Sequence, residues 1–371
     1  MKYVDEYRDP ALARKLLDSI ARLADRPMAF MEFCGGHTHA IMQHGIRQLL
    51  PSTVRLMSGP GCPVCVTSQT DIDRAIALAR MPGAIIATFG DMVRVPGSEY
   101  SLQEAAAQGA DVRIVYSPLD AVQLAQALPN RQFIFLGIGF ETTAPGVAAS
   151  ILQAETLGLT NYTVFSMHKL TPPAMRGILD AGEVRLDGVI GPGHVTTIIG
   201  SNAWRFLPDE YGMPIVVSGF EPVDILLTVE RLARQVVEGR AEVGNSYSRS
   251  VHSEGNQAAL RVMWQVFQLS DADWRGFGIL PGSGMAIRER YARFDASRRF
   301  PVTVGSSREP PGCYCGEVLR GVMEPLDCPL FAKGCTPERP IGPCMVSSEG
   351  ACAAYFLYGR FERVTLEPEV A

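Results

Sequence analysis

Short apolar segments alternate with amphipathic segments along the first 240 residues of the chain. Apolar residues recur at helical spacing from Pro10 to about Ala24, and Asp9 is a suitable N-cap, so this stretch predicts a first helix. Eight segments rich in β-branched and apolar residues predict strands at residues 28–33, 54–57, 84–89, 112–116, 133–137, 163–167, 188–190 and 215–218. Further amphipathic patterns predict helices at residues 71–80, 119–127, 147–157 and 222–237.

Alternation of strands with helices, with nearly continuous apolar strands, is typical of parallel sheets covered on both faces. The sequence therefore predicts an α/β protein. The triplet Gly-Phe-Glu occurs at 139–141 and again at 219–221, which fits two similar α/β lobes. We expect a first domain over residues 1–120, a second over 121–240 and a C-terminal domain over 241–371.

The pattern changes beyond residue 240. One long helical stretch at 255–268 is followed by a glycine-rich loop at 277–284 and by a tail rich in Pro, Gly and Cys. Such a tail has too little apolar periodicity to build a core. We expect it to have little regular structure and to fold around a metal centre, which would supply the missing stabilisation.

Composition and charge exclude several classes of protein. The 371 residues carry a formal net charge of -5, and no cluster of Lys and Arg forms the basic surface that nucleic-acid binding needs. No apolar run approaches the roughly 20 residues that span a bilayer, and the N-terminus lacks the apolar core of a signal peptide. We therefore expect a cytoplasmic protein that binds neither nucleic acid nor membrane.

The chain contains nine cysteines, an odd number that argues against a disulfide framework in a reducing compartment. They form two groups, one near each end of the chain: Cys34, Cys62 and Cys65, then Cys313, Cys315, Cys328, Cys335, Cys344 and Cys352. This distribution predicts two separate chemistries.

The C-terminal group has the spacing Cys-x-Cys-x12-Cys-x6-Cys-x8-Cys-x7-Cys. Structural zinc sites usually show paired Cys-x2–4-Cys knuckles, often with His, and no His follows His252. All-thiolate ligation by scattered cysteines favours an iron–sulfur cluster, with zinc and inert buried thiols as the alternatives. Six cysteines exceed the four ligands that such a cluster takes, so two are spare or redox-active.

The N-terminal cysteines occur in two different sequence contexts. Cys62 and Cys65 form a Cys-x-x-Cys pair before a predicted helix, a setting that favours reversible disulfide formation, and half of a zinc knuckle is the alternative. Cys34 follows a predicted strand and precedes Gly-Gly-His-Thr-His, which brings His37 and His39 near it. This context favours a metal-binding or nucleophilic thiol over a small buried hydrophobe.

Four further polar residues lie at predicted strand ends, and each is as well suited to capping a helix or satisfying a loop as to chemistry. They are Asp91, Arg94, Glu141 and His194.

Several long motifs occur together and in order along the whole chain: Cys-Gly-Gly-His-Thr-His-Ala-Ile (34–41), Gly-Pro-Gly-Cys-Pro-Val-Cys (59–65), Gly-Phe-Glu-Thr-Thr-Ala-Pro (139–145), Gly-Pro-Gly-His-Val (191–195), Phe-Gly-Ile-Leu-Pro-Gly-Ser-Gly (277–284), Asp-Cys-Pro-Leu-Phe (327–331) and Ser-Ser-Glu-Gly-Ala-Cys-Ala-Ala-Tyr (347–355). In these motifs the chain closely resembles the HypD family of [NiFe]-hydrogenase maturation factors.

The resemblance implies an assembly scaffold with redox activity rather than a conventional turnover enzyme. On it the Fe(CN)2(CO) unit is built in complex with a HypC-type chaperone, with cyanide from HypE and HypF, before delivery to the hydrogenase large subunit. The family carries a [4Fe-4S] cluster in a domain that follows two α/β domains.

The resemblance also implies roles for individual residues. Cys34 would be the thiolate that binds the cargo Fe(II), and His37 would hydrogen-bond or transiently ligate beside it. Cys62 and Cys65 would be the redox pair. The cluster ligands would be Cys315, Cys328, Cys335 and Cys352, which leaves Cys313 and Cys344 as spare thiols or relay thiols.

Two other functions remain open on the residues alone. A free-standing, cluster-dependent thiol–disulfide oxidoreductase would use the same Cys-x-x-Cys pair and cluster, but it has no need of the Cys34 loop. A zinc-stabilised hydrolase using His37 or His194 has less support, because the cysteine spacing fits zinc poorly.

Overall fold

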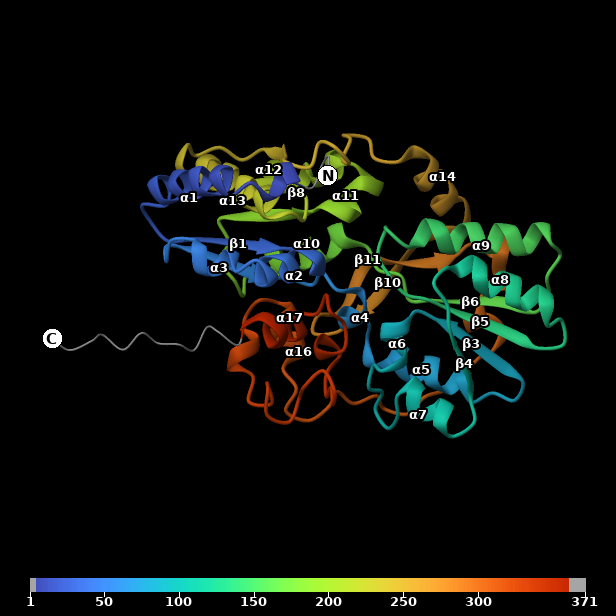
Figure 1. Cartoon of the computed structure of the whole chain (residues 1–371). Helices are drawn as coiled ribbons and strands as arrows, with labels where there is room; N and C mark the ends of the chain where they lie inside the picture. Colours follow the sequence, from blue (N-terminus) through green and yellow to red (C-terminus); the bar gives the residue numbers. More distant parts are fainter. Residues whose placement is uncertain (1–4, 360–371) are drawn as a thin grey trace.

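Two parallel β-sheets form the two lobes of the protein, as the computed structural model shows for residues 5–359 (Figure 1). The first sheet has the spatial order β2 (Val54–Ser58), β1 (Met28–Glu32), β7 (Gly188–Pro192), β8 (Ile215–Ser218) and β9 (Val243–Asn245). The second has the order β4 (Asp111–Ile114), β3 (Ala84–Thr88), β5 (Gln132–Gly137) and β6 (Tyr162–Ser166). Both sheets are parallel throughout, so the predicted α/β class is confirmed.

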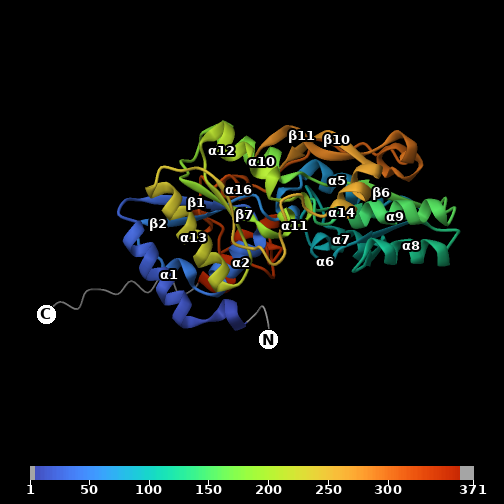
Figure 2. The ribbon, with the colours of Figure 1, turned by 90° about the horizontal axis from the view of Figure 1, so that it is seen from above.

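Helices cover both faces of the first sheet. One face packs on helices that include α1 (Pro10–Leu23) and α13 (Pro222–Val237), together with α2 (Gly35–Gln43) and α3 (Ile46–Leu49). The other face packs on α10 (Thr171–Ala181), α11 (Gly193–Ile199) and α12 (Phe206–Tyr211), and Figure 2 shows α10 and α12 on the side opposite α1.

The second sheet is covered in the same way. Its two faces pack on α8 (Pro118–Ala127), α9 (Ala144–Thr156) and α14 (Gln257–Val266), and on α5 (Gln69–Ala79) and α7 (Leu102–Ala107). The predicted N-cap of α1 is confirmed, because the Asp9 carboxylate accepts backbone N–H groups from the first turn of the helix. The shorter helices are α4 (Pro63–Val66), α6 (Gly90–Val93), α15 (Ala296–Arg299), η1 (Asp5–Arg8), η2 (Ser201–Trp204) and η3 (Glu289–Phe294).

The sheets are interleaved along the sequence, because the whole second sheet lies between β2 and β7. The predicted ranges 1–120 and 121–240 therefore do not coincide with the sheets, since each range contains strands of both. The reason is the pairing of β1 with β7, in which Met31 lies beside Val189. Strand neighbours that far apart in sequence leave no mark on the local hydrophobic pattern.

A long antiparallel hairpin follows α14. It consists of β10 (Phe267–Trp274) and β11 (Gly278–Ile287), with an irregularity between Ser270 and Ala272. The predicted glycine-rich loop at 277–284 is therefore mostly strand, and the predicted helix at 255–268 ends two residues early. Pairing with β10 satisfies the backbone of this Gly-rich segment, which overrides the loop-forming tendency of its residues.

The C-terminal segment has little regular structure, as predicted. Beyond α15 and up to residue 359, where the described part of the chain ends, it contains α16 (Cys315–Leu319), η4 (Pro325–Asp327), η5 (Pro343–Met345) and α17 (Ala351–Tyr358). α17 packs on α2, so this segment lies against the first lobe and beside the boundary with the second (Figure 1).

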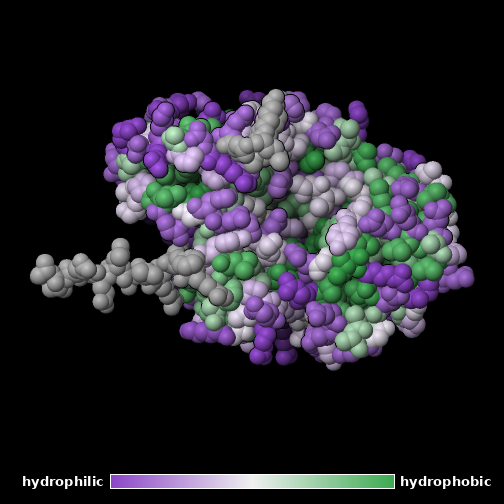
Figure 3. Space-filling model, in the orientation of Figure 1, coloured by the Kyte–Doolittle hydropathy of each residue, from purple (hydrophilic) through white to green (hydrophobic). Residues whose placement is uncertain are grey.

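The molecular surface has both polar and apolar areas. On the face in Figure 3, polar side chains cover the helices of the first lobe, and apolar side chains gather on the second lobe toward the middle. Within residues 5–359, no helix combines the length and the apolar character that crossing a membrane requires.

Candidate functional site

Cys34 lies where β1 ends and α2 begins, at the carboxyl edge of the first sheet. Its carbonyl accepts the backbone N–H groups of His37 and Thr38, and its own N–H donates to the Glu32 carboxylate at 2.8 Å. The side chain is 7% exposed. The turn into α2 therefore holds the Cys34 thiol in an almost fully buried position.

Two other loops enclose Cys34, and both approach too closely for any side chain but hydrogen. A Cβ on Gly61 would lie 2.5 Å from the Cys34 Cα, and a Cβ on Gly35 would lie 2.5 Å from the Glu349 Cβ. The loop of the Cys-x-x-Cys pair and the loop that precedes α17 therefore meet at Cys34.

Two carboxyl groups flank the thiol. Burial raises the pKa of Glu32 to about 8, although its carboxylate accepts hydrogen bonds from the Cys34 N–H and the Thr38 hydroxyl. Burial also raises the pKa of Glu349. Burial first, and then the charges of Glu349 and Glu32, raise the pKa of the Cys34 thiol. This environment favours the protonated thiol of Cys34 over the thiolate.

An aromatic wall stands beside Cys34. The rings of His37 and His194 both stack on Phe220, with centroids 4.6 Å and 3.9 Å away. Burial lowers the pKa of His37 to about 4, so the ring is neutral near pH 7. His37 Nε2 lies 3.2 Å from the Ser218 carbonyl, which can only accept, so Nε2 carries the proton and Nδ1 keeps its lone pair. Nδ1 is buried with no hydrogen-bond partner.

Cys62 and Cys65 are joined by a disulfide, at the loop that follows β2. Cys62 caps α4, and the backbone N–H of Cys65 points at the Cys62 sulfur at 3.2 Å. Both residues are buried. The predicted pair is therefore close enough to exchange between dithiol and disulfide.

All six C-terminal cysteines line one cavity: Cys313, Cys315, Cys328, Cys335, Cys344 and Cys352. Cys315 and Cys344 are joined by a disulfide, whereas the other four have free thiols. This pairing differs from the sequence prediction, which made Cys315 a ligand and Cys313 spare. Residues two apart in a turn present their side chains in different directions, and spacing alone does not show which one faces the other free thiols.

The four free thiols suit a polynuclear centre. Burial raises the pKa of Cys352 well above its ordinary value, and the charges of Cys313, Cys335 and Cys328 raise it further. Because the four free thiols line one cavity, they could hold a [4Fe-4S] cluster with one sulfur for each iron. In the part of the chain that the structure describes, no three His, Cys, Asp or Glu side chains converge on a point that could hold a single metal ion.

The three sulfur-bearing features adjoin one another. The Cys65 sulfur lies 3.8 Å from the Pro343 carbonyl, and Pro343 precedes Cys344 in the chain. The Cys62–Cys65 pair, the Cys315–Cys344 pair and the cavity of free thiols therefore follow one another in space, with Cys34 against the first of them.

Among the polar residues at predicted strand ends, Glu141 and Arg94 stabilise the fold, and His194 lies at the site. The Glu141 carboxylate accepts the Thr171 N–H and hydroxyl, so it caps α10. Arg94 donates to the Val346 carbonyl and holds the cysteine-rich segment in place. His194 belongs to the aromatic wall described above.

Sequence reasoning missed Glu32, Phe220 and Glu349. The repeated Gly-Phe-Glu triplet contains Phe220, but as a sequence signal it indicates repeated lobes and not a site. Glu349 stands in the motif at 347–355, which gives no hint that the side chain lies against Gly35.

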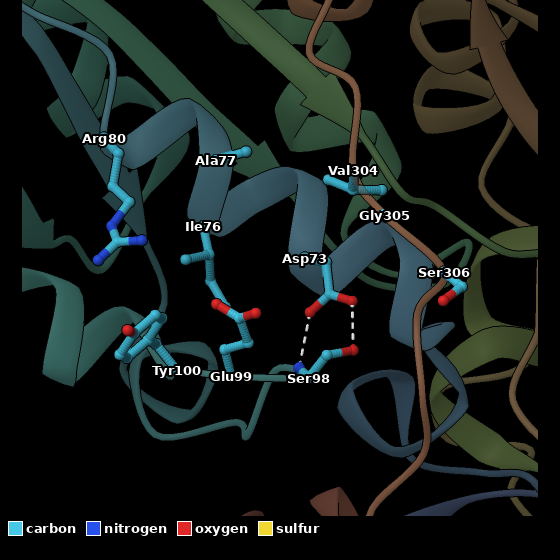
Figure 4. A pocket seen from close by; sticks show the side chains of 10 residues that line it. All are labelled: Asp73, Ile76, Ala77, Arg80, Ser98, Glu99, Tyr100, Val304, Gly305 and Ser306. Carbon is cyan, nitrogen blue, oxygen red and sulfur yellow. Dashed lines mark hydrogen bonds between the residues drawn. The ribbon is translucent and has the colours of Figure 1, made fainter.

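A second cavity, of about 260 Å3, lies away from these residues between α5, the loop at 98–100 and the extended segment at 304–306 (Figure 4). Asp73 accepts two hydrogen bonds from Ser98 there, and the Arg80 guanidinium lies 4.5 Å from the centre of the Tyr100 ring. None of the predicted site residues is among those that line it.

Comparisons with known proteins cover nearly the whole chain. The HypD family model, described as "Hydrogenase formation hypA family", matches residues 11–359. The chain is 53% identical to the hydrogenase maturation factor HypD of Azotobacter vinelandii over 369 residues, which is 97% of each chain. It is 50% identical to the hydrogenase expression/formation protein HupD of Azotobacter chroococcum and 47% identical to HypD of Cupriavidus necator, with 99% of each chain covered in both cases.

Proposed function

This chain belongs to the HypD family of hydrogenase maturation factors, and from that premise we propose that it is the iron–sulfur scaffold on which the Fe(CN)2(CO) unit is assembled. The observation that carries the proposal is the enclosure of Cys34 by the dithiol loop and the loop before α17. A scaffold needs a thiolate that holds the cargo iron next to a source of electrons. The turn with Cys34 would supply the thiolate, and the dithiol loop packed against it would supply the electrons.

The proposed partners are those that the assembly chemistry requires. A HypC-type chaperone would share the cargo iron with Cys34, and HypE, charged by HypF, would donate cyanide. The hydrogenase large subunit would receive the finished unit. Family membership establishes a role in hydrogenase maturation, and the partners named here are our proposal for that role.

At Cys34 the residues prepare an iron-binding thiolate. When Fe(II) binds, the thiol gives its proton to solvent, and the cation stabilises the resulting thiolate beside the carboxyl groups of Glu32 and Glu349. Thiolate is a strong donor to low-spin Fe(II), which is the state that cyanide and CO favour. The Nδ1 lone pair of His37 is the nearby group free to accept a hydrogen bond or ligate transiently.

For the electron supply we propose that Cys313, Cys328, Cys335 and Cys352 hold the [4Fe-4S] cluster. Three of these are the ligands expected from sequence, and Cys313 replaces Cys315 because Cys315 is bonded to Cys344. A cluster in this cavity would supply single electrons at low potential. The Cys62–Cys65 disulfide takes up two electrons and two protons to give two thiols, and the Cys315–Cys344 pair lies between it and the cavity.

The experiment that tests the scaffold is infrared spectroscopy on the protein purified without oxygen together with its chaperone. The wild type should show cyanide and CO stretching bands, and Cys34→Ala should lose them completely, because the cargo iron has no thiolate on this chain.

Cys328→Ala is the matched control, because it removes a proposed cluster ligand and leaves the Cys34 thiol in place. This variant should lose the visible absorbance of the cluster. A protein that keeps its cyanide and CO bands after Cys34→Ala is not the proposed scaffold. A cluster-bearing wild type with no such bands would instead favour the free-standing thiol–disulfide oxidoreductase.

A further inference from the structure

Arg275 is a buried arginine attached to the loop of the Cys62–Cys65 pair. It follows β10 and is 2% exposed. Its backbone N–H donates to the Val66 carbonyl at 3.0 Å, one residue after Cys65, and its Nη2 donates to the Gln69 side chain at 3.1 Å. The side chain is therefore fixed with respect to the dithiol.

The same loop also contacts the cysteine cavity. A Cβ on Gly276 would lie 2.6 Å from the Gly316 Cα, so the backbone after Arg275 lies directly against α16, next to Cys315. Arg275 therefore directly precedes a segment that touches the helix bearing Cys315, one of the residues that line the cysteine cavity.

The hydrogen-bonding capacity of Arg275 is only partly used. Its Nε is buried and has no hydrogen-bond partner, and its Nη1 lies 3.4 Å from a carboxylate oxygen of Glu309, a residue with a 45% exposed side chain. The carboxylates of Asp73 and Asp273 also act on the guanidinium, as does Cys313. A buried cation with an unsatisfied donor is costly.

We propose that Arg275 is a positioning residue whose fixed positive charge, held between the dithiol loop and the cavity of free thiols, favours the reduced form of the centre that these thiols bind. The inference rests on the proposed cluster at Cys313, Cys328, Cys335 and Cys352. One-electron reduction adds one negative charge to that centre without making or breaking a bond to the chain. A nearby cation stabilises the more negative form, and net charge is one of the factors that set cluster potentials.

The test is a redox titration of the full-length protein, purified without oxygen, with dithionite as the electron donor and electron paramagnetic resonance as the readout. At a fixed potential, Arg275→Gln should lower the ratio of reduced to oxidised cluster about tenfold, which for one electron is a midpoint about 59 mV more negative. Arg275→Lys keeps the charge and should stay near the wild-type midpoint.

Glu309→Gln supplies a shift of opposite sign. It removes an exposed carboxylate that partly offsets Arg275, so its midpoint should move to less negative values. Because Glu309 is half exposed, this variant keeps the test decisive even where Arg275→Gln fails to fold. Arg320→Gln is the matched control: Arg320 donates to the carbonyl of Gly276 on the same loop but pairs outward with Glu183, so the midpoint should not change.

Two results overturn the inference. One is a full cluster whose midpoint is the same in the wild type, Arg275→Gln and Glu309→Gln. The other is a shift in Arg275→Lys or Arg320→Gln as large as that in Arg275→Gln, because packing rather than charge would then be the cause. A wild-type protein that binds no cluster refutes the proposed ligand set instead, and cluster content is measured separately by iron analysis.

Discussion

At the scale of single residues, the main finding is the pair of carboxyl groups beside Cys34. Glu32 and Glu349 raise the pKa of the thiol, and burial raises it more. A raised pKa keeps Cys34 in the thiol form, which is a weaker nucleophile than the thiolate. These surroundings therefore suit the proposed binding of a cation, which displaces the proton, better than nucleophilic catalysis.

The buried Glu32 makes stability depend on pH. Its pKa is about 8 in the folded protein and near 4.5 when exposed, so between these values the folded state binds a proton that the unfolded state releases. Its contribution is full below pH 4.5 and is lost as the pH rises through about 8. We therefore expect the metal-free wild type to lose more free energy of unfolding than Glu32→Gln between about pH 6 and pH 9.

Urea unfolding at several pH values measures this difference. Glu289→Gln is the control, because the Glu289 side chain is 83% exposed and the substitution should leave the wild-type pH dependence in place. Parallel stability curves for the wild type and Glu32→Gln would show that Glu32 does not take up a proton on folding.

The choice between Cys313 and Cys315 also belongs to this scale. Cys313→Ala should reduce the iron content, about four irons per chain when the cluster is intact, to a small fraction, because it removes one of four ligands. Cys315→Ala and Cys344→Ala should keep the cluster, because these two sulfurs are bonded to each other. Iron analysis with visible absorbance distinguishes the variants, and cluster loss in Cys315→Ala with retention in Cys313→Ala would restore the ligand set expected from sequence.

At the scale of elements, the close approach of loops sets the geometry of the site. Gly61→Ala would place a Cβ 2.4 Å from the Cys34 nitrogen, and backbone atoms cannot move aside as a flexible side chain can. We expect a loss of about 1–3 kcal/mol in the free energy of unfolding, as for other overpacked positions. Urea denaturation of the metal-free protein measures it.

Gly146→Ala is the matched control for this substitution. It lies in the first turn of α9, where a Cβ would meet only Pro118, at 4.0 Å, so its stability should be equal to or slightly above that of the wild type. Equal stability of both variants would mean that the dithiol loop moves away from Cys34 easily.

Elements with a strong local pattern could be predicted from the sequence. The eight predicted strands correspond to β1–β8. Most of them are buried parallel strands and therefore nearly continuous apolar runs, whereas the edge strand β4 is only half-buried. The hairpin of β10 and β11 could not be predicted in this way: Asp271, Asp273 and several glycines interrupt its pattern, and pairing between the two strands compensates. The dithiol was found because its spacing is itself the signal, whereas Glu349 reaches Cys34 through tertiary packing alone.

At the scale of the whole molecule, the arrangement of the lobes explains why the sulfur-bearing loops meet. β1, β2, β7 and β8 end at one edge of the first sheet, so the loops with Cys34, Cys62, His194 and Phe220 gather there. α17 packs on α2 and brings the cysteine-rich segment to the same edge. The order of strands in this sheet decides the site, and that order is the property that local sequence patterns do not contain.

The interleaved order of the sheets has a consequence for synthesis on the ribosome. All four strands of the second sheet have been synthesised once residue 166 has left the ribosome. At that point the first sheet has only β1 and β2, and it still lacks β7, β8 and β9. The loop with Glu349, which helps to enclose Cys34, follows all the strands of both sheets along the chain. Cys34 therefore lacks one of its two enclosing loops until every strand of both sheets has been made.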